Sequence, residues 1–364
     1  MKKETCQCPE RLGKVGGQAV MEGVMMRSGE NVSVAVRNED KSITIVNDKF
    51  VSVRQKHKIL NTPILRGIVN MVEMLKLSYK TLNISADAFV GDAFEEEPTK
   101  FEKWIEKHFG KSILDVVMLI AMILGVVLGV GMFVLLPSAV VGGADHLVGG
   151  FISEYNLFAL IEGVIRIAIF VLYIYLVSLM GYIRRTFEYH GAEHKSIACY
   201  EAGEELTPEN AKKHSRYHPR CGTSFMFVIM IISIFIFTAA RMLFSALAEN
   251  LLLYWASKIL LVPIVIGLGF EFIMYAGKHN GPLVRILSAP GLWMQRITTR
   301  EPDDEQLEVA IAAIKAAMPD QFPADEASTA SEESNTEANA KENPNPSSQQ
   351  SDEAVGAEQA NDEK

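Results

Sequence analysis

Leu157–Met180 reads LFALIEGVIRIAIFVLYIYLVSLM, an apolar run long enough to cross a lipid bilayer as a helix. A span needs about 20 mostly apolar residues, because each helical residue advances about 1.5 Å through the hydrocarbon core. Glu162 and Arg166 interrupt the run at the spacing and in the order that favour an internal ion pair. The stretch therefore predicts a membrane helix with one structural ion pair, which decides the class of the whole fold.

Three further runs have the same length and apolar character. They are Ile113–Leu136, Ser224–Leu243 and Leu251–Ala276. Together these runs predict an α-helical integral membrane protein with four transmembrane helices within residues 111–278. Lys and Arg are absent from the connection 137–156 and frequent in the loop 181–223 and in the segment before the first span. By the positive-inside rule, we expect that loop and both termini of this multi-pass protein in the cytoplasm.

Residues 1–110 precede the first span and predict a small N-terminal α+β domain on the cytoplasmic side. Short runs with alternating apolar residues predict an antiparallel β-meander, with turn-forming residues between them. The runs are Val32–Arg37, Ser42–Asn47 and Phe50–Gln55. A helix is expected from Thr62 and Pro63 to about Ala88, because Thr caps helices and Pro suits the first helical turn.

Residues 13–29 read GKVGGQAVMEGVMMRSG and admit two interpretations. The glycines permit turns and close backbone approach, which is typical of a bent strand. Glu22 and Gln18 lie among Val and Met, which indicates instead a loop of a functional site with a carboxylate turned inward. Both interpretations stay open at this point.

Residues 279–318 follow the last span and predict interfacial and cytoplasmic helices, since Trp293 and Arg296 suit the membrane surface. Residues 319–364 are rich in Glu, Ser, Asn, Gln and Ala and have too few large apolar residues to build a core. They predict a disordered acidic tail. Twelve acidic and two basic residues from Asp320 onward account for the formal net charge of -9, so the rest of the chain is nearly neutral.

The four cysteines give no disulfide framework and suit a reducing compartment. They are Cys6, Cys8, Cys199 and Cys221, and the Cys6-Gln7-Cys8 pair alone is a weak metal signal. The chain has no P-loop, no dinucleotide fingerprint and no basic cluster with interleaved aromatic residues. We therefore expect the lipid bilayer as a partner, and no nucleic acid.

His190-Gly191-Ala192-Glu193-His194 follows the second span and has the order H-x-x-E-H, the inverse of the zinc-protease signature. On a helix, His190 and His194 lie one turn apart and are able to share a metal ion. Glu193 then stands beside the metal, where a general base takes a proton from an activated water. The pattern predicts a divalent metal site, with zinc as the expected ion.

His218-Pro219-Arg220-Cys221-Gly222 precedes the third span and predicts a bent loop at the same membrane face. His218 or Cys221 is expected to supply a third metal ligand, because zinc accepts both imidazole and thiolate donors. Arg216 or Arg220 is expected to hold the negative charge that develops during a hydrolysis. Weaker ligand candidates are Glu22, Glu201, His214 and Glu271.

The histidines also have an interpretation without a metal. Two imidazoles in a helix beside the membrane are able to contact lipid headgroups or to pair with Glu188 and Glu193. The main hypothesis is a metal-dependent hydrolase at the cytoplasmic membrane surface, acting on a membrane protein or a lipid. The alternative is a non-enzymatic membrane adaptor whose cytoplasmic parts bind a partner. A transporter subunit is a weaker alternative, because four spans without an internal repeat are few.

Several stretches together resemble the YqhQ-like family of bacterial membrane proteins. They are Gly16–Arg27, His190–His194, His218–Thr223, Pro290–Trp293 and Thr298–Pro302. The resemblance covers roughly residues 10–317 and omits the acidic tail. It implies a protein of the bacterial cell membrane, from a family of unknown function that is described as predicted metal-dependent enzymes. It implies neither a substrate nor a reaction.

Overall fold

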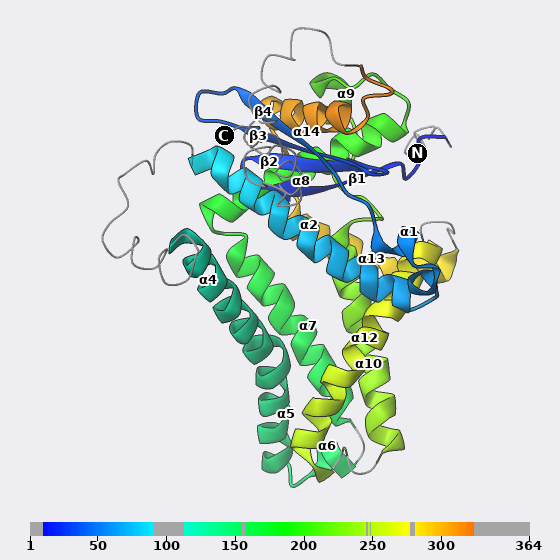
Figure 1. Cartoon of the computed structure of the whole chain (residues 1–364). Helices are drawn as coiled ribbons and strands as arrows, with labels where there is room; N and C mark the ends of the chain where they lie inside the picture. Colours follow the sequence, from blue (N-terminus) through cyan, green and yellow to red (C-terminus); the bar gives the residue numbers. More distant parts are fainter. Residues whose placement is uncertain are drawn as a thin grey trace, which may run out of the picture. The chain divides into compact units, whose positions relative to one another are not determined.

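The computed structural model describes residues 10–90, 113–154, 157–244, 247, 249–276 and 281–323. Cys6, Cys8 and nearly all of the predicted acidic tail lie outside these residues. The described part is mostly helical, with one small antiparallel sheet near the N-terminus (Figure 1).

Four strands form this sheet. They are β1 (Val15–Val20), β2 (Gly23–Ser28), β3 (Asn31–Arg37) and β4 (Ile43–Lys49). The helices before the first long apolar helix are α1 (Val53–Lys56), the 3-10 turn η1 (Lys58–Asn61) and α2 (Leu65–Val90). The helices that follow are α4 (Ile113–Val130), the π-helical turn η3 (Gly131–Leu135), α5 (Leu136–Leu147), α6 (Phe151–Glu154), α7 (Phe158–Val177), α8 (Gly181–Glu201), α9 (Pro208–Lys212), α10 (Gly222–Leu243), α12 (Leu251–Ala276), α13 (Pro282–Thr298) and α14 (Asp304–Ala317).

The sheet has the strand order β1-β2-β3-β4, and every neighbouring pair is antiparallel. The predicted meander is correct in type but starts earlier, because residues 13–29 form the hairpin β1–β2. The strand interpretation of that stretch is confirmed. The predicted strand Phe50–Gln55 is wrong: the Ser52 side chain accepts a hydrogen bond from the Arg54 N–H and caps the short helix α1 there.

The two faces of the sheet carry different helices, because successive side chains of a strand point to opposite faces. Val20, Met25, Val34 and Val36 pack with Leu77 of α2 on one face. The other face is covered by α8 and α14 (Figure 1). Within residues 279–318, for which interfacial and cytoplasmic helices are predicted, the structure has the helices α13 and α14, and the buried apolar face of α14 packs on the sheet.

Among the described residues, four helices are long and apolar enough to cross a membrane. They are Ile120–Leu147, Phe158–Val177, Gly222–Leu243 and Leu252–Ala276. The first continues beyond the predicted end at Leu136, because Pro137 lies in the first turn of α5, where its missing N–H costs little. The loop predicted over 181–223 is largely helical, and a turn at residues 178–180 separates α8 from α7.

A buried polar cluster joins three of these apolar helices. The predicted pair of Glu162 and Arg166 is confirmed, with 2.7 Å between Oε1 and the guanidinium nitrogen. The Glu162 carboxylate also accepts hydrogen bonds from Ser138 (2.8 Å), Tyr254 (2.8 Å) and Lys258. The cluster therefore ties α5, α7 and α12 together, and Lys258 was not singled out from the sequence.

Candidate metal centre

The H-x-x-E-H motif lies in the buried middle of α8, where another segment crosses the helix. The Arg300 N–H donates to the Phe187 carbonyl at 2.8 Å. A Cβ at Gly191 would lie 2.0 Å from the Arg300 carbonyl oxygen, so only glycine permits this crossing. The crossing brings the Thr298 carbonyl against His190 and the Arg300 backbone against Phe187 and Gly191.

Three potential metal donors converge between α8 and the start of α10. The donor atoms of His190, His194 and Cys221 all lie within 4.8 Å of one another. His190 Nε2 is 3.2 Å from Cys221 Sγ, and the two imidazole centroids are 4.4 Å apart. Cys221 is the N-cap residue of α10, so the start of that helix positions its thiol.

The orientation of both imidazoles is set by backbone carbonyl groups. His190 Nδ1 lies 2.8 Å from the Thr298 oxygen, and His194 Nδ1 lies 2.6 Å from the Arg216 oxygen. A carbonyl oxygen only accepts hydrogen bonds, so each Nδ1 must carry the proton. Each Nε2 then keeps its lone pair for a ligand. This arrangement is typical of histidines that bind metals.

Glu193 is buried beside these donors and lacks a full set of partners. Its Oε2 atom has no hydrogen-bond partner among the described residues. Burial raises the pKa of the Glu193 carboxyl to about 7, although the nearby His190 opposes this rise. A carboxyl group with such a pKa suits proton transfer near neutral pH.

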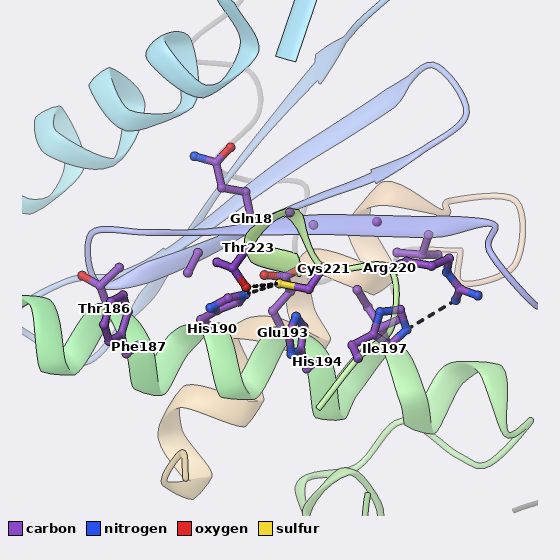
Figure 2. A pocket seen from close by; sticks show the side chains of 16 residues that line it. Gln18, Thr186, Phe187, His190, Glu193, His194, Ile197, Arg220, Cys221 and Thr223 are labelled. Atoms are coloured by element: carbon purple, nitrogen blue, oxygen red, sulfur yellow. Dashed lines mark hydrogen bonds between the residues drawn. The ribbon is translucent and has the colours of Figure 1, made fainter. Parts of the chain in front are cut away.

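A pocket of about 430 Å³ lies between α8, β1 and the segment that leads into α10. Figure 2 shows His190 and Cys221 pointing toward each other, with Glu193 nearby on α8. The lining residues are Val15, Gly16, Gly17, Gln18, Ala19, Thr186, Phe187, His190, Glu193, His194, Ile197, His218, Arg220, Cys221, Gly222 and Thr223. The residues 13–29 that were interpreted as a strand or a site loop thus contribute both a strand and a pocket wall.

His218, the other predicted third ligand, lies in the pocket wall but outside the group of converging donors. Its ring centroid is 5.5 Å from that of His194, and its Nε2 is 3.8 Å from a Glu201 oxygen. Burial lowers the pKa of His218, so the ring is held neutral. The Gln295 amide accepts from the His218 N–H and donates to its carbonyl, both at 2.8 Å. This pair of hydrogen bonds holds the loop that carries Cys221.

The two candidate arginines differ in position. Arg220 lines the pocket and pairs with Glu201. Arg216 lies outside the pocket lining, and its guanidinium donates to the Thr299 carbonyl and the Tyr217 hydroxyl, each at 3.1 Å. Of these two candidates, the structure places only Arg220 in the pocket lining.

The weaker ligand candidates each have another partner. Glu22 binds Arg185 and Tyr189, Glu201 binds Arg220 and the Gly13 N–H, His214 binds Glu204, and Glu271 binds Arg66. Burial works against ionisation of Glu201, but hydrogen bonds from His218 and Gly13 and the charge of Arg220 lower the pKa of its carboxyl. None of these four residues belongs to the group of donors around His190 in the described part of the chain.

A second group of possible ligands lies apart from the pocket lining. The donor atoms of Cys199, Glu204 and His214 are also within 4.8 Å of one another. Burial raises the pKa of the Cys199 thiol to about 11, so this thiol stays protonated near neutral pH. Because none of its three members lines the pocket, this group is the weaker candidate.

Several residues at the site were not assigned a role from the sequence. Gln295 donates a hydrogen bond to the His218 carbonyl, and the Thr298 carbonyl accepts one from His190. The Thr223 hydroxyl lies 3.2 Å from Cys221 Sγ. Thr223 and Thr298 lie in stretches that carried the family resemblance, and Gln295 lies between two of them. The family resemblance of those stretches was therefore a sign that they belong to the site. The backbone carbonyl groups that orient the two imidazoles cannot be recognised in a sequence.

The family model described as "Protein of unknown function (DUF1385)" matches residues 62–320. The chain belongs to this family. It is also 33% identical over 302 residues to "Uncharacterized protein YqhQ" of Bacillus subtilis (strain 168), which covers 81% of this chain and 89% of the relative. No solved structure matches the chain. The family match contains all three converging donors and Glu193, whereas β1 precedes it.

Proposed function

We propose that the protein is a metal-dependent hydrolase that works at the cytoplasmic surface of the membrane. One observation carries the proposal. His190, His194 and Cys221 converge, and each imidazole holds a backbone carbonyl through Nδ1 so that its Nε2 offers a lone pair, beside the unpartnered buried oxygen of Glu193 in the described structure. A buried polar atom without a partner is costly in a folded protein, and a water, an ion or a substrate that binds beside it removes this cost.

The place of the site relative to the membrane follows from the apolar helices. We infer that the four long apolar helices span the bilayer, with both termini and α8 on the cytoplasmic side. The pocket borders Gly222 and Thr223, the first residues of α10, which is one of those helices. Its entrance therefore lies at the membrane surface, within reach of a membrane-associated substrate.

The donor set fits a zinc ion. Zinc binds both imidazole and thiolate donors, and a zinc site with three protein ligands keeps a further position open. A zinc ion held there supplies a Lewis acid that activates water near neutral pH. Glu193 accepts a proton from the attacking water and returns it to the leaving group as the bond to that group breaks. Arg220 is the one Arg or Lys among the described lining residues and is therefore our candidate for holding the developing negative charge.

Elemental analysis of the purified full-length protein tests this proposal. We expect about one zinc ion per chain in the wild type, and none in the His190→Ala/His194→Ala variant. A matched control, His57→Ala/His146→Ala, removes two exposed imidazoles outside the pocket lining and should keep the metal. Equal metal content in the wild type and the first variant would contradict the proposal and favour the adaptor.

A further inference from the structure

One wall of the pocket is the open edge of the sheet. Within the described sheet, β1 pairs only with β2 and forms one edge. Val20 and Gly23 close a two-residue hairpin, so the N–H and C=O groups of Val20, Gln18 and Gly16 point toward β2. The Arg37 N–H donates to the Glu22 carbonyl at 2.8 Å, which independently shows that the Gly23 groups point away from β3.

The alternate residues of β1 therefore direct their backbone groups outward. These residues are Gly17 and Ala19, and both line the pocket. Within the part of the chain that the structure describes, no hydrogen bond is formed by the outward N–H and C=O of either residue. An unpaired strand edge is a template for another extended chain.

This edge of β1 lies directly against Glu193 and the two histidines of α8. A Cβ at Gly17 would come within 2.9 Å of Glu193 Cγ, so the strand backbone passes next to the proposed base. Figure 2 shows β1 running along α8, with Glu193 and the two histidines projecting from the helix. Any chain that pairs with Gly17 and Ala19 would have its own backbone next to these groups.

The spacing between β1 and α8 is held at both ends of the strand. At one end the Gly13 N–H donates to Glu201 at 2.8 Å. At the other end Glu22, in the β1–β2 turn, pairs with Arg185 of α8. The pocket wall is therefore preorganised, which lowers the cost of ordering a bound chain.

The pattern of free groups identifies the class of ligand. Gly17 and Ala19 present donors and acceptors in alternation, at the repeat of about 6.8 Å per two residues of an antiparallel strand. A polypeptide backbone in extended conformation presents the complementary series. A lipid headgroup offers no such series of N–H and C=O groups.

We propose that the substrate of this site is an extended polypeptide segment that adds as a strand to β1 at Gly17 and Ala19. This inference rests on the proposed hydrolase function. Water adds its oxygen to the carbonyl carbon of a peptide bond, and the C–N bond breaks. One water proton passes through Glu193 to the leaving amine, and the second is released from the new carboxylic acid.

The test uses the full-length protein in detergent and a fluorescein-labelled mixture of ten-residue peptides with randomised positions. Binding is measured by fluorescence anisotropy on the Glu193→Gln variant, and cleavage by mass spectrometry on the wild type. Ala19→Pro removes one outward N–H and leaves the hydrogen bonds to β2 intact, since Pro is tolerated at such edge positions. Ala19→Ser is the matched control that keeps the N–H. In the Glu193→Gln background we expect Ala19→Pro to weaken binding by about tenfold and Ala19→Ser to leave it unchanged.

A second measurement does not depend on how the variant folds. Each position of a peptide that is cleaved is N-methylated in turn, which removes one donor at a time. Strand addition predicts that sensitive positions alternate with insensitive ones. Uniform insensitivity to methylation, together with normal binding by Ala19→Pro, would overturn strand addition. Zinc-dependent hydrolysis of 4-nitrophenyl acetate without peptide binding would overturn this inference and leave the hydrolase proposal standing. Absence of bound zinc would overturn the hydrolase proposal, while the anisotropy measurement would still decide whether β1 binds a chain.

Discussion

Glu162 and Glu193 are both buried carboxylates, with 1% and 6% of each residue exposed, but their surroundings differ. Glu162 accepts hydrogen bonds from Ser138, Arg166, Tyr254 and Lys258. Glu193 has one oxygen with no partner among the described residues, and it lines a pocket. Burial alone therefore does not separate a structural charge from a reactive one.

The two carboxylates differ in whether hydrogen-bond partners offset the cost of burying them. The saturated contacts of Glu162 offset the cost of burying its charge and fasten apolar helices to one another. The unpartnered oxygen of Glu193 has lost its hydration without gaining a hydrogen bond, and this cost is offset only when another group binds beside it. We therefore assign Glu162 to the stability of the helix bundle and Glu193 to the proposed chemistry, and the following substitutions test that assignment.

The largest expected effect is that of Glu193→Gln on hydrolysis. The amide keeps the shape of the side chain but cannot take a proton, so peptide cleavage should fall by about 10²–10⁴-fold. Zinc content should persist, and the free energy of unfolding should change by less than about 1 kcal/mol, because few hydrogen bonds are lost. Cleavage rate, metal content and unfolding in detergent measure the three quantities. A large loss of stability with an unchanged cleavage rate would reverse the assignment.

The next largest effect is that of Glu162→Leu on stability. Lys258 and Arg166 then lose their carboxylate partner, and the free energy of unfolding should fall by about 3–5 kcal/mol. The double variant Glu162→Leu/Lys258→Met should recover part of this loss, because Lys258 no longer leaves a buried unpaired charge. Unfolding in detergent measures both. Wild-type stability in the single variant would show that Glu162 is not a structural clamp.

A smaller effect is expected for Gln295→Leu, which keeps every proposed ligand. It removes two hydrogen bonds to the His218 backbone and thereby loosens the loop of Cys221. Zinc affinity should weaken by about 10–100-fold, as for other outer contacts of metal sites. Competition with a chelator measures the affinity, and Gln55→Leu, at an exposed glutamine, is the control. Equal affinities in the two variants would remove Gln295 from the site.

The smallest effect is expected for Arg66→Ala. Arg66 binds Glu271 at 2.6 Å, and their side chains, at 29% and 26% exposed, are much less enclosed than the Glu162 cluster. The loss of unfolding free energy should be at most about 1 kcal/mol. Unfolding in detergent compares it with Glu162→Leu. A loss as large as that of Glu162→Leu would mean that a carboxylate with a full set of partners stabilises the fold even when it is not buried.

The parts of the site that could be predicted from the sequence are those set by local geometry. His190, Glu193 and His194 share adjoining turns of one helix, and helical periodicity alone places them together. The choice between His218 and Cys221 was left open, because both residues lie in one bent loop. Packing against Gln295 turns His218 toward Glu201 and leaves Cys221 beside His190.

Errors in the predicted elements also have physical causes. The apolar pattern predicts that the first span ends before Pro137, yet proline suits the first turn of a continuing helix segment. Phe50–Gln55 has the alternation of a strand, but the Ser52 hydroxyl caps a helix there and binds Glu73 of α2. The sheet takes its additional strands from residues 13–29, whose glycines obscured their strand pattern.

The sequence by itself determined the family, the apolar helices, two strands of the antiparallel meander and the proximity of the two histidines to Glu193. Each depends on composition or on residues within a few positions of one another. Only the tertiary structure decided that Cys221 meets His190 across 31 positions, and that Thr298 sets the His190 proton across 108. It also decided that the edge of β1 forms the pocket wall. Such contacts depend on how separate elements pack, and no local periodicity encodes that packing.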